Sequence, residues 1–493
     1  MPQMTLDQAF QLAFKHQAAG RLKEAEALYQ QILAVKPDHA DSLHLLGVIA
    51  GQRDDNAAAV EWISKAIALA PEAAMYHNNL GAFSRRMGKM DQAMAAYKKA
   101  VELQPDYADA RYNLGNILRD SGHLDQSIAE YIEAVRLRPG HAETHNNFGF
   151  ALLELGRIED AAAQYRDAIR LRPDYADAHL NLAFALLVRG DFERGLPEYE
   201  WRARRPAHGM PPLPQPQWDG GELTGKTILI RSEQGLGDGI QFVRYVPLLA
   251  ARGATVILEC LPELRRLFQD APGAAHVVAR GEAPAPFDLH CPLASLPLVF
   301  GTRLESIPAV TPYLHADSRV VQAQAARLNI NGDTLNVGLV WAGNPDHRND
   351  RKRSMSLEQL SPLAEVKGVR FFSLQKGKPA EQVRTPPAGM NLLDAAGELS
   401  DFADTAALIA RLDLVITVDT AVAHLAGAMG RPVWVLLPFA PDWRWLLGRD
   451  DSPWYPTMRL VRQDAPGQWE PVVARVEKEL AGLYAKMKTQ GIR

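Results

Sequence analysis

Residues 414–430 read LVITVDTAVAHLAGAMG, a pattern that predicts a strand, a tight turn and a helix. Positions 414–418 are apolar and mostly β-branched, as in a buried strand, and the residues after the turn are rich in alanine. Asp419 and Thr420 stand where a helix N-cap belongs, and His424 lies one turn further on. In a parallel sheet such a turn lies at the carboxyl edge, where the unpaired N–H groups of the helix start favour an anion such as phosphate. We therefore expect Asp419, Thr420 and His424 to face one ligand. The alternative is that Asp419 only caps the helix and that His424 is a packed polar residue.

The composition of the chain is typical of a large globular protein and argues against several classes of partner. The 493 residues, 47% of them apolar, are enough for about three domains. Lys plus Arg number 54 against 58 for Asp plus Glu, a net charge of -4, so we expect no nucleic-acid partner. Asp7 and Lys15 interrupt any amino-terminal apolar core, and no later apolar stretch is long enough to span a bilayer, which predicts no transmembrane segment. The two cysteines, Cys260 and Cys291, form neither a disulfide framework nor a four-ligand zinc site, so we expect a cytoplasmic protein.

A period of 34 residues runs through the first 200 positions. Its registers are Pro37, Pro71, Pro105, Pro139 and Pro173; Gly47, Gly81, Gly115 and Gly149; Gly88, Gly122, Gly156 and Gly190; and Tyr97, Tyr131, Tyr165 and Tyr199. The pattern resembles the tetratricopeptide repeat, whose unit is two antiparallel helices. Small residues let the two helices approach, and proline ends the second helix. We expect an α solenoid of about six repeats over residues 1–205, with a degraded sixth repeat because Pro197 interrupts its second helix.

One register of the repeat is informative about binding. Its members are Asn79, Asn113, Asn147 and Asn181. A similar asparagine ladder in protein O-GlcNAc transferases grips a peptide backbone, since an amide can donate and accept at once. We therefore expect a protein or peptide in the solenoid groove. The alternative is that these residues fill a solvated face.

The pattern changes to strands alternating with helices after a linker predicted at 206–225, which is rich in proline and glycine. We expect two Rossmann-like α/β halves, at 226–330 and 331–493. Strands are expected at 227–232, 256–260, 276–279 and 288–291 in the first half and at 337–341, 369–374, 414–418 and 432–437 in the second. The turn QGLGDG at 234–239 lacks a true G-x-G-x-x-G, which argues against a tightly bound dinucleotide.

Two such halves resemble the GT-B architecture of many sugar-nucleotide transferases. The segments GLGDG at 235–239 and DTAVAHLAG at 419–427 resemble the two signatures of the ADP-heptose lipopolysaccharide heptosyltransferases, with similarity over roughly residues 226–463. The array joined to such a domain is also similar in layout to O-GlcNAc transferases. The resemblance implies that Asp238 is the general base. The donor-binding residues that it implies are Gly235, Gly237, Arg353, Asp419, Thr420, Ala421 and His424.

Two positions need separate comment. Ala421 stands where the resembled family usually has glycine, and its methyl group could crowd a phosphate. Arg353 is the closest match to a lysine that neutralises the donor's diphosphate in that family. It ends a basic run that also contains Arg348, Arg351 and Lys352; the alternative is an ordinary solvated loop. No two aspartates lie two residues apart, so we expect no catalytic metal and no cofactor besides a nucleotide-sugar substrate.

Two functions of different class follow from these patterns. The first is an inverting glycosyltransferase that moves a sugar from a nucleotide-sugar donor to an acceptor hydroxyl, with the solenoid binding a protein or other large acceptor. The second is a tetratricopeptide scaffold whose transferase-like domain has lost its activity.

Overall fold

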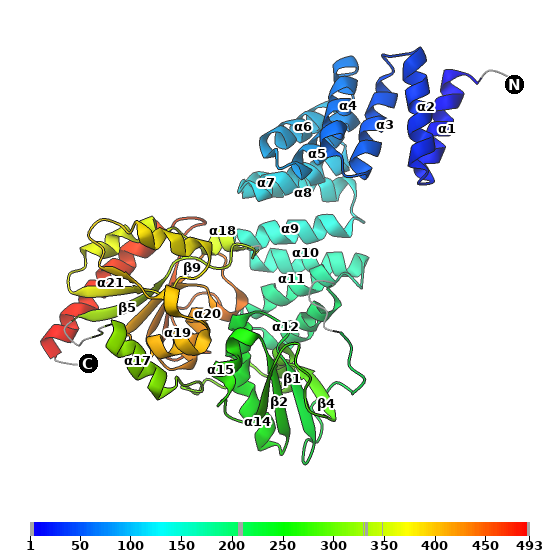
Figure 1. Cartoon of the computed structure of the whole chain (residues 1–493). Helices are drawn as coiled ribbons and strands as arrows, with labels where there is room; N and C mark the ends of the chain where they lie inside the picture. Colours follow the sequence, from blue (N-terminus) through cyan, green and yellow to red (C-terminus); the bar gives the residue numbers. More distant parts are fainter. Residues whose placement is uncertain (1–3, 206–210, 329, 331–333, 348, 491–493) are drawn as a thin grey trace. The chain divides into compact units, whose positions relative to one another are not determined.

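The chain divides into two compact units, 1–178 and 179–493, in a computed structural model that describes residues 4–205, 211–328, 330, 334–347 and 349–490 (Figure 1). The first part of the predicted linker, 206–210, lies outside the described residues. So do Arg348 of the basic run and residue 331, where the second α/β half was expected to begin.

The first unit is a series of antiparallel helix pairs, as the 34-residue period predicts. Its helices are α1 (Leu6–Ala18), α2 (Leu22–Val35), α3 (Ala40–Gln52), α4 (Asn56–Leu69), α5 (Ala74–Arg86), α6 (Met90–Leu103), α7 (Ala108–Asp120), α8 (Leu124–Leu137), α9 (Ala142–Glu154) and α10 (Ile158–Leu171). A sixth pair, α11 (Ala176–Leu187) and α12 (Phe192–Tyr199), begins at the end of this unit and continues in the second. The prediction of an α solenoid is confirmed.

The glycine and tyrosine registers are two sides of one contact in the third, fourth and fifth helix pairs. A Cβ atom added to Gly81 would lie 2.7 Å from the ring of Tyr97, and one added to Gly149 would lie equally close to the ring of Tyr165. The tyrosine ring therefore occupies the space that the missing side chain leaves, and any larger residue would separate the helices. At the turn between helices, Gly88 has a φ of +73°, a conformation that favours glycine.

The boundary between the two compact units falls inside the sixth helix pair. The boundary between units falls at 178/179, whereas the sequence pattern placed it at 205. Pro197 lies inside α12, which has only eight residues and continues as η1 (Glu200–Arg204). The ring of Phe192 packs edge-on against Trp443 at a centroid distance of 6.1 Å, which joins α12 to the core of the second unit.

The first sheet of the second unit is parallel, with strand order β3-β2-β1-β4. Its strands are β1 (Thr227–Arg231), β2 (Thr255–Cys260), β3 (Ala274–Ala279) and β4 (Leu289–Pro292). The helices around it are α13 (Leu236–Phe242), η2 (Val243–Tyr245), α14 (Val246–Ala251), η3 (Pro262–Leu264), α15 (Arg265–Phe268), η4 (Leu293–Ser295), α16 (Leu296–Val299) and η5 (Leu304–Ser306). Trp218, which follows the linker, is buried and joins the edge of this sheet by donating its backbone N–H to the carbonyl of His290 at 2.8 Å.

The second sheet is also parallel and has the order β10-β9-β8-β5-β6-β7. Its strands are β5 (Leu335–Val340), β6 (Val369–Ser373), β7 (Leu392–Asp394), β8 (Leu414–Val418), β9 (Val433–Leu437) and β10 (Met458–Arg462). Its helices are α17 (Ser318–Leu328), α18 (Asp350–Arg353), η6 (Leu357–Glu365), η7 (Lys378–Arg384), η8 (Ala396–Glu398), α19 (Phe402–Ile409), α20 (Ala421–Ala428), η9 (Trp443–Trp445) and α21 (Glu470–Gln490). The sequence patterns did not predict β7 or β10. The strand order reverses between β5 and β8, and ligands of open parallel sheets bind beyond the carboxyl ends of strands at such a point.

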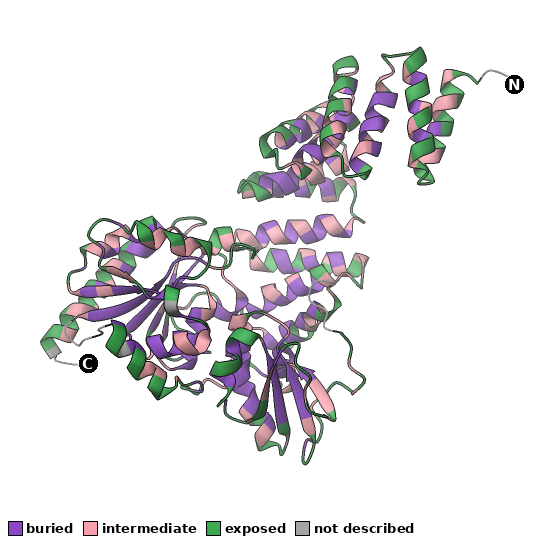
Figure 2. Cartoon of the chain, viewed as in Figure 1, coloured by how far each residue is buried: buried purple, intermediate pink, exposed green. Residues whose placement is uncertain are grey.

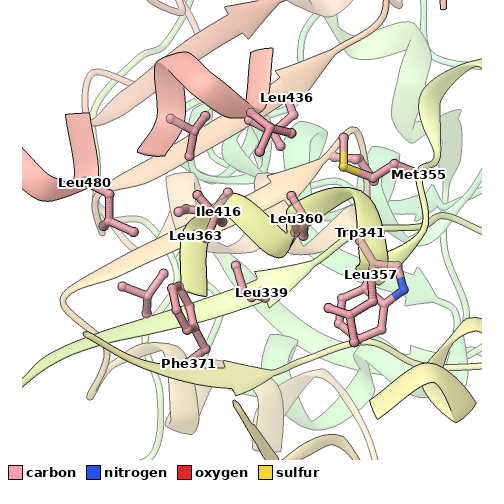
Figure 3. Close-up of a cluster of buried hydrophobic side chains, with 14 of the residues drawn as sticks. Leu339, Trp341, Met355, Leu357, Leu360, Leu363, Phe371, Ile416, Leu436 and Leu480 are labelled. Atoms are coloured by element: carbon pink, nitrogen blue, oxygen red, sulfur yellow. The ribbon is translucent and has the colours of Figure 1, made fainter. Parts of the chain in front are cut away.

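The core of the second sheet fixes the position of these strand ends. Figure 2 shows that the central strands of both sheets, β1 and β2 in the first and β5 and β8 in the second, are largely buried. Figure 3 shows Leu339 of β5 and Ile416 of β8 facing Leu360 and Leu363 of η6, with Leu480 of α21 closing the cluster. Burial of about 1.5–3 kcal/mol per large apolar side chain makes this cluster the main stabilising element of the second half. None of the helices in the described ranges is long and apolar enough to cross a bilayer.

Candidate functional site

The loop after β1 places Asp238 at the start of α13. Gly235 is the N-cap of this helix, and its backbone N–H donates to Asp238 Oδ2 at 3.0 Å. The other carboxylate oxygen, Oδ1, accepts a hydrogen bond from the guanidinium of Arg444. The Asp238 side chain is 24% exposed. Each oxygen therefore has a protein partner, and the carboxylate remains accessible from solvent.

Arg444 lies on η9 in the second half and reaches across to the first half. Its Nε donates to Gln241 Oε1 at 2.7 Å and its Nη1 donates to Asp442 Oδ1 at 2.8 Å. The side chain is only 8% exposed, and its guanidinium lies over the ring of Trp443 at 4.5 Å. Asp238 and Asp442 both form ion pairs with this buried guanidinium, so its charge is compensated within the protein.

The turn between β8 and α20 carries the predicted anion-binding residues. Thr420 is the N-cap of α20, with an extended backbone (φ −141°, ψ 171°), and Asp419 is half-buried. The hydroxyl of Thr420 pairs with that of Thr417 at 3.0 Å, and within the described part of the chain no side-chain hydrogen bond caps the start of α20. Ala421 is half-buried as the first residue of the helix. Burial raises the pKa of Asp419 to about 6.

His424 packs against α13 rather than standing in open space. Its Nδ1 pairs with the hydroxyl of Tyr455 at 2.9 Å, and its ring stacks on Trp445 with centroids 5.0 Å apart. Burial, with the positive charges of Arg444 and Arg244, lowers the pKa of His424 well below its usual range. A Cβ atom added to Gly237 would lie 2.9 Å from His424 Cδ2, so this glycine lets α13 and α20 approach. The positions of Gly237 and His424 are explained by this packing, and their contact with a donor stays a prediction.

Arg353 is the inward-facing member of the predicted basic run. Arg351 and Lys352 are exposed, whereas the side chain of Arg353 is 17% exposed. A Cβ atom on Gly343 would lie 2.7 Å from Arg353 Nη2, so the guanidinium rests directly on the turn that follows β5. Asp350 Oδ1 lies 3.6 Å from Arg353 Nε, and it also accepts a hydrogen bond from Ser354, which fixes this turn.

These residues form one electrostatic cluster at the carboxyl edges of the two sheets. The negative charge of Asp442 adds to the rise in the pKa of Asp419, whereas the charges of Arg353 and Arg444 lower it. Burial and the charge of Arg353 lower the pKa of His347, on the loop beyond β5, and Asp238 acts on the same ring in the opposite direction. The structure thus brings Asp238, Arg353 and Asp419 together, although they lie more than 60 residues apart in the sequence.

Sequence reasoning missed the C-terminal wall of this cluster. The missed residues are Asp442, Trp443, Arg444, Trp445 and Tyr455, which follow β9. A signal was present: three of the nine tryptophans lie within 443–454, in the stretch WRWLLGRDDSPW. Such a density of buried aromatic residues around an arginine indicates a packed, charge-bearing site.

The predicted asparagine ladder lies on the first helix of each repeat and is half-buried. Asn79 Nδ2 pairs with His44 at 2.8 Å, Asn113 Nδ2 donates to Asn78 at 3.0 Å, and Asn147 Nδ2 donates to Tyr112 at 3.0 Å. Each bond reaches the preceding repeat, so these amides join neighbouring repeats. Asn181 lies on α11 in the second unit. Peptide binding by this register stays a prediction.

The part of the chain that the structure describes contains no group of three His, Cys, Asp or Glu side chains that could hold a metal ion. The expectation of metal-independent chemistry stays a prediction.

Comparisons with known proteins identify both parts of the chain. Models of tetratricopeptide repeats match residues 12–74, 85–118, 115–156, 151–188 and 176–201. The model described as glycosyltransferase family 9 (heptosyltransferase) matches residues 358–437, a range that includes Asp419 and His424. Protein FlbA of Caulobacter vibrioides (strain ATCC 19089 / CIP 103742 / CB 15) is 30% identical over 295 residues, which are 55% of this chain and 49% of that protein. The chain thus spans about half the length of the curated relative it matches.

Solved structures match the repeat region. YrrB, described as a tetratricopeptide-repeat protein with an unusual peptide-binding site, is 22% identical over 36% of this chain and 90% of its own, with a TM-score of 0.32. The protein pilF of Pseudomonas aeruginosa is 19% identical over 40% of this chain and 90% of its own, with a TM-score of 0.38. The family models alone place tetratricopeptide repeats and, over residues 358–437, a glycosyltransferase family 9 (heptosyltransferase) domain in one chain.

Proposed function

We propose that the second unit is an inverting, metal-independent glycosyltransferase that moves a sugar from a nucleotide-sugar donor to an acceptor hydroxyl. The observation that carries this proposal is the grouping of an accessible carboxylate, Asp238, with two arginines, Arg353 and Arg444, beyond the strand ends of both sheets. The family 9 match supports the same class of enzyme.

In the proposed reaction, Asp238 is the general base. A carboxylate oxygen can accept more than one hydrogen bond, so Oδ1 and Oδ2 can each accept from an acceptor hydroxyl in addition to their protein partners. As the acceptor oxygen forms its bond to the anomeric carbon, its proton moves to the carboxylate and the bond from that carbon to the diphosphate breaks. Attack from the face opposite the leaving group inverts the configuration.

Negative charge grows on the departing nucleoside diphosphate. Arg353 and the backbone N–H groups at the start of α20 are positioned to stabilise this charge more than they stabilise the bound donor, which is the condition for catalysis. The pKa of Asp419, which precedes the start of α20, is raised to about 6, so below that pH its neutral carboxyl group would not repel the diphosphate.

In the proposed complex, the solenoid presents a protein or another large acceptor to this site. Tetratricopeptide repeats commonly bind extended peptides, and the half-buried amides of Asn79, Asn113 and Asn147 offer acceptors and donors along one side of the array.

A second candidate is a scaffold whose transferase domain is inactive. Two features favour it: Asp238 is ion-paired with Arg444, and α20 begins with Ala421, where the resembled family usually has glycine. In this case the ion pair would serve only to join the two halves of the unit.

Titration of the full chain with a panel of UDP-, ADP-, GDP- and CMP-sugars, followed by an assay for released nucleotide, tests the proposal. We expect one donor class to bind and turn over, and Asp238→Asn to bind it but not turn it over. Asp317→Asn, an exposed carboxylate on the approach to α17, is the matched control and should behave as wild type. Binding of no donor, or equal turnover by wild type and Asp238→Asn, would favour the scaffold.

A further inference from the structure

Tyr199 breaks the pattern of its own register. Tyr97, Tyr131 and Tyr165 each lie over a glycine of the preceding helix, at 2.7–2.8 Å from the position of a missing Cβ. Tyr199 occupies the same place in the sixth repeat, but it belongs to the second unit and packs edge-on against Trp443, with ring centroids 5.8 Å apart.

The hydroxyl of Tyr199 is hydrogen-bonded to the loop that carries Asp238. It donates to Gln234 Oε1 at 2.8 Å. Gln234 directly precedes Gly235, whose backbone N–H donates to Asp238 Oδ2 at 3.0 Å. Tyr199 therefore fixes the residue next to the peptide group that holds one oxygen of the carboxylate.

Arg444 holds the other oxygen, and it also approaches Tyr199. Its Nη2 donates to Asp238 Oδ1 and lies 3.5 Å from the hydroxyl of Tyr199. Bonds to Gln241 and Asp442 fix the guanidinium itself. The carboxylate of Asp238 is thus fixed at both oxygens. The hydroxyl of Tyr199, a residue that is only 3% exposed, contacts both Gln234 and Arg444.

We propose that Tyr199 and Arg444 are positioning residues that orient the carboxylate of Asp238, so that the last helix of the repeat pattern completes the transferase site. This inference rests on the proposed function. It accounts for two facts together: α12 packs with the α/β unit, and its buried tyrosine has its hydroxyl directed at the glycine-rich loop.

A positioning role and a packing role give different results. Replacing tyrosine by phenylalanine keeps the ring and its contact with Trp443 and removes only the hydroxyl. If Tyr199 merely packs, this change should leave turnover unaltered. If it orients Asp238, kcat should fall while donor binding stays the same, because misplacement of a catalytic group by about 1 Å can lower a rate by up to 100-fold.

The experiment uses the full chain and the sugar nucleotide that the wild type turns over fastest in the UDP-, ADP-, GDP- and CMP-sugar panel. Tyr199→Phe and Gln234→Ala remove the two ends of one hydrogen bond. Tyr97→Phe, the same change in the same register of the first unit, is the matched control. Arg444→Lys tests the second support.

We expect Tyr199→Phe and Gln234→Ala to lower kcat about 10-fold or more with an unchanged Kd for the nucleoside diphosphate. The double variant should be no slower than the slower single variant, since both changes break the same bond. The pH profile of kcat should change in Tyr199→Phe and Arg444→Lys and stay as in wild type in Tyr97→Phe. Should one variant fail to fold, the partner at the other end of the bond still gives the result.

Unchanged kcat and an unchanged pH profile in both Tyr199→Phe and Gln234→Ala, with Asp238→Asn inactive, would overturn this inference and leave the proposed function standing. A wild type that turns over no member of the panel would overturn the proposed function, and the inference with it.

Discussion

The close approach of α13 and α20 gives a sharp prediction for Gly237→Ala. The added methyl carbon would lie 2.9 Å from His424 Cδ2 and 3.4 Å from Nε2. The first distance is well inside van der Waals contact. The histidine cannot move away easily, because its Nδ1 is bonded to Tyr455 and its ring is stacked on Trp445. The two helices must therefore separate.

The size of the effect follows from two opposing terms. Overpacking of a well-packed contact costs about 1–3 kcal/mol. Alanine in place of glycine in a helix gains about 0.5–1 kcal/mol from reduced backbone entropy of the unfolded chain. The difference is a net loss of about 0–2.5 kcal/mol in the free energy of unfolding of the second unit, with a midpoint of about 1 kcal/mol.

The assay is urea unfolding followed by tryptophan fluorescence, with no donor present. Of the nine tryptophans, all but Trp62 lie in residues 179–493, so the signal reports the second unit. Gly482→Ala is the matched control. Gly482 is an exposed glycine inside α21 with no atom within 4 Å of an added Cβ, and alanine there should stabilise by about 0.5–1 kcal/mol.

The two variants should therefore shift the unfolding midpoint in opposite directions. A Gly237→Ala protein stabilised as much as Gly482→Ala would refute the packing argument. It would favour the alternative that this glycine serves only the approach of a donor, since such a role leaves the ligand-free protein unaffected.

Four further predictions concern the rest of the second unit. Asp238→Asn should abolish transfer and spare donor binding, because an amide keeps the shape but cannot take the proton; calorimetry and product assays on one sample check this. Arg353→Ala should weaken binding of a nucleoside diphosphate by about 1.5–3 kcal/mol and hardly affect the bare nucleoside, and equal losses for both ligands would remove it from the site. Deletion of residues 1–170 should leave a protein that still folds and unfolds cooperatively by circular dichroism, whereas deletion of residues 1–205 also removes the Phe192 contact and should abolish cooperative unfolding. The pKa of Asp419 is raised from 3.8 to about 6, so the folded state binds the proton more tightly than the unfolded state. The free energy of unfolding of wild type, relative to that of Asp419→Asn, should therefore fall as the pH rises from about 4 to about 6. A difference between the two proteins that does not change with pH would refute the shift.

The sequence predicts those helices and strands whose pattern of residues is visible within a short stretch of chain. The 34-residue period predicts the helix pairs because each pair repeats the same contact, and the run at 414–418 predicts β8 because a central parallel strand is buried on both faces. The two missed strands lie at the edges of the second sheet. β7 has three residues, too few for a pattern, and in β10 the sequence MRLVR carries arginines that edge strands tolerate.

The sequence predicts the residues of the candidate site that follow a strand, but not the contacts between residues that lie far apart in the chain. Asp238 and Asp419 each follow a strand in a recognisable turn, so local sequence indicates that they lie at a sheet edge. Arg444 contacts Asp238 across 206 residues, and no periodicity links an arginine after β9 to a carboxylate after β1. Only the packing of one half against the other brings these two charges together.

The sixth repeat shows how a repeat pattern can predict a helix without predicting its neighbour. The tyrosine register continues to position 199, but the glycine register stops, since Ala183 stands where glycine is expected and Leu187 instead packs against Gly195. The first repeat has the same pair of residues, Ala13 and Tyr29, and both lie in one buried cluster of the first unit, whereas the ring of Tyr199 packs against Trp443. The repeat pattern therefore predicts helix α12 but not the surface that its tyrosine covers.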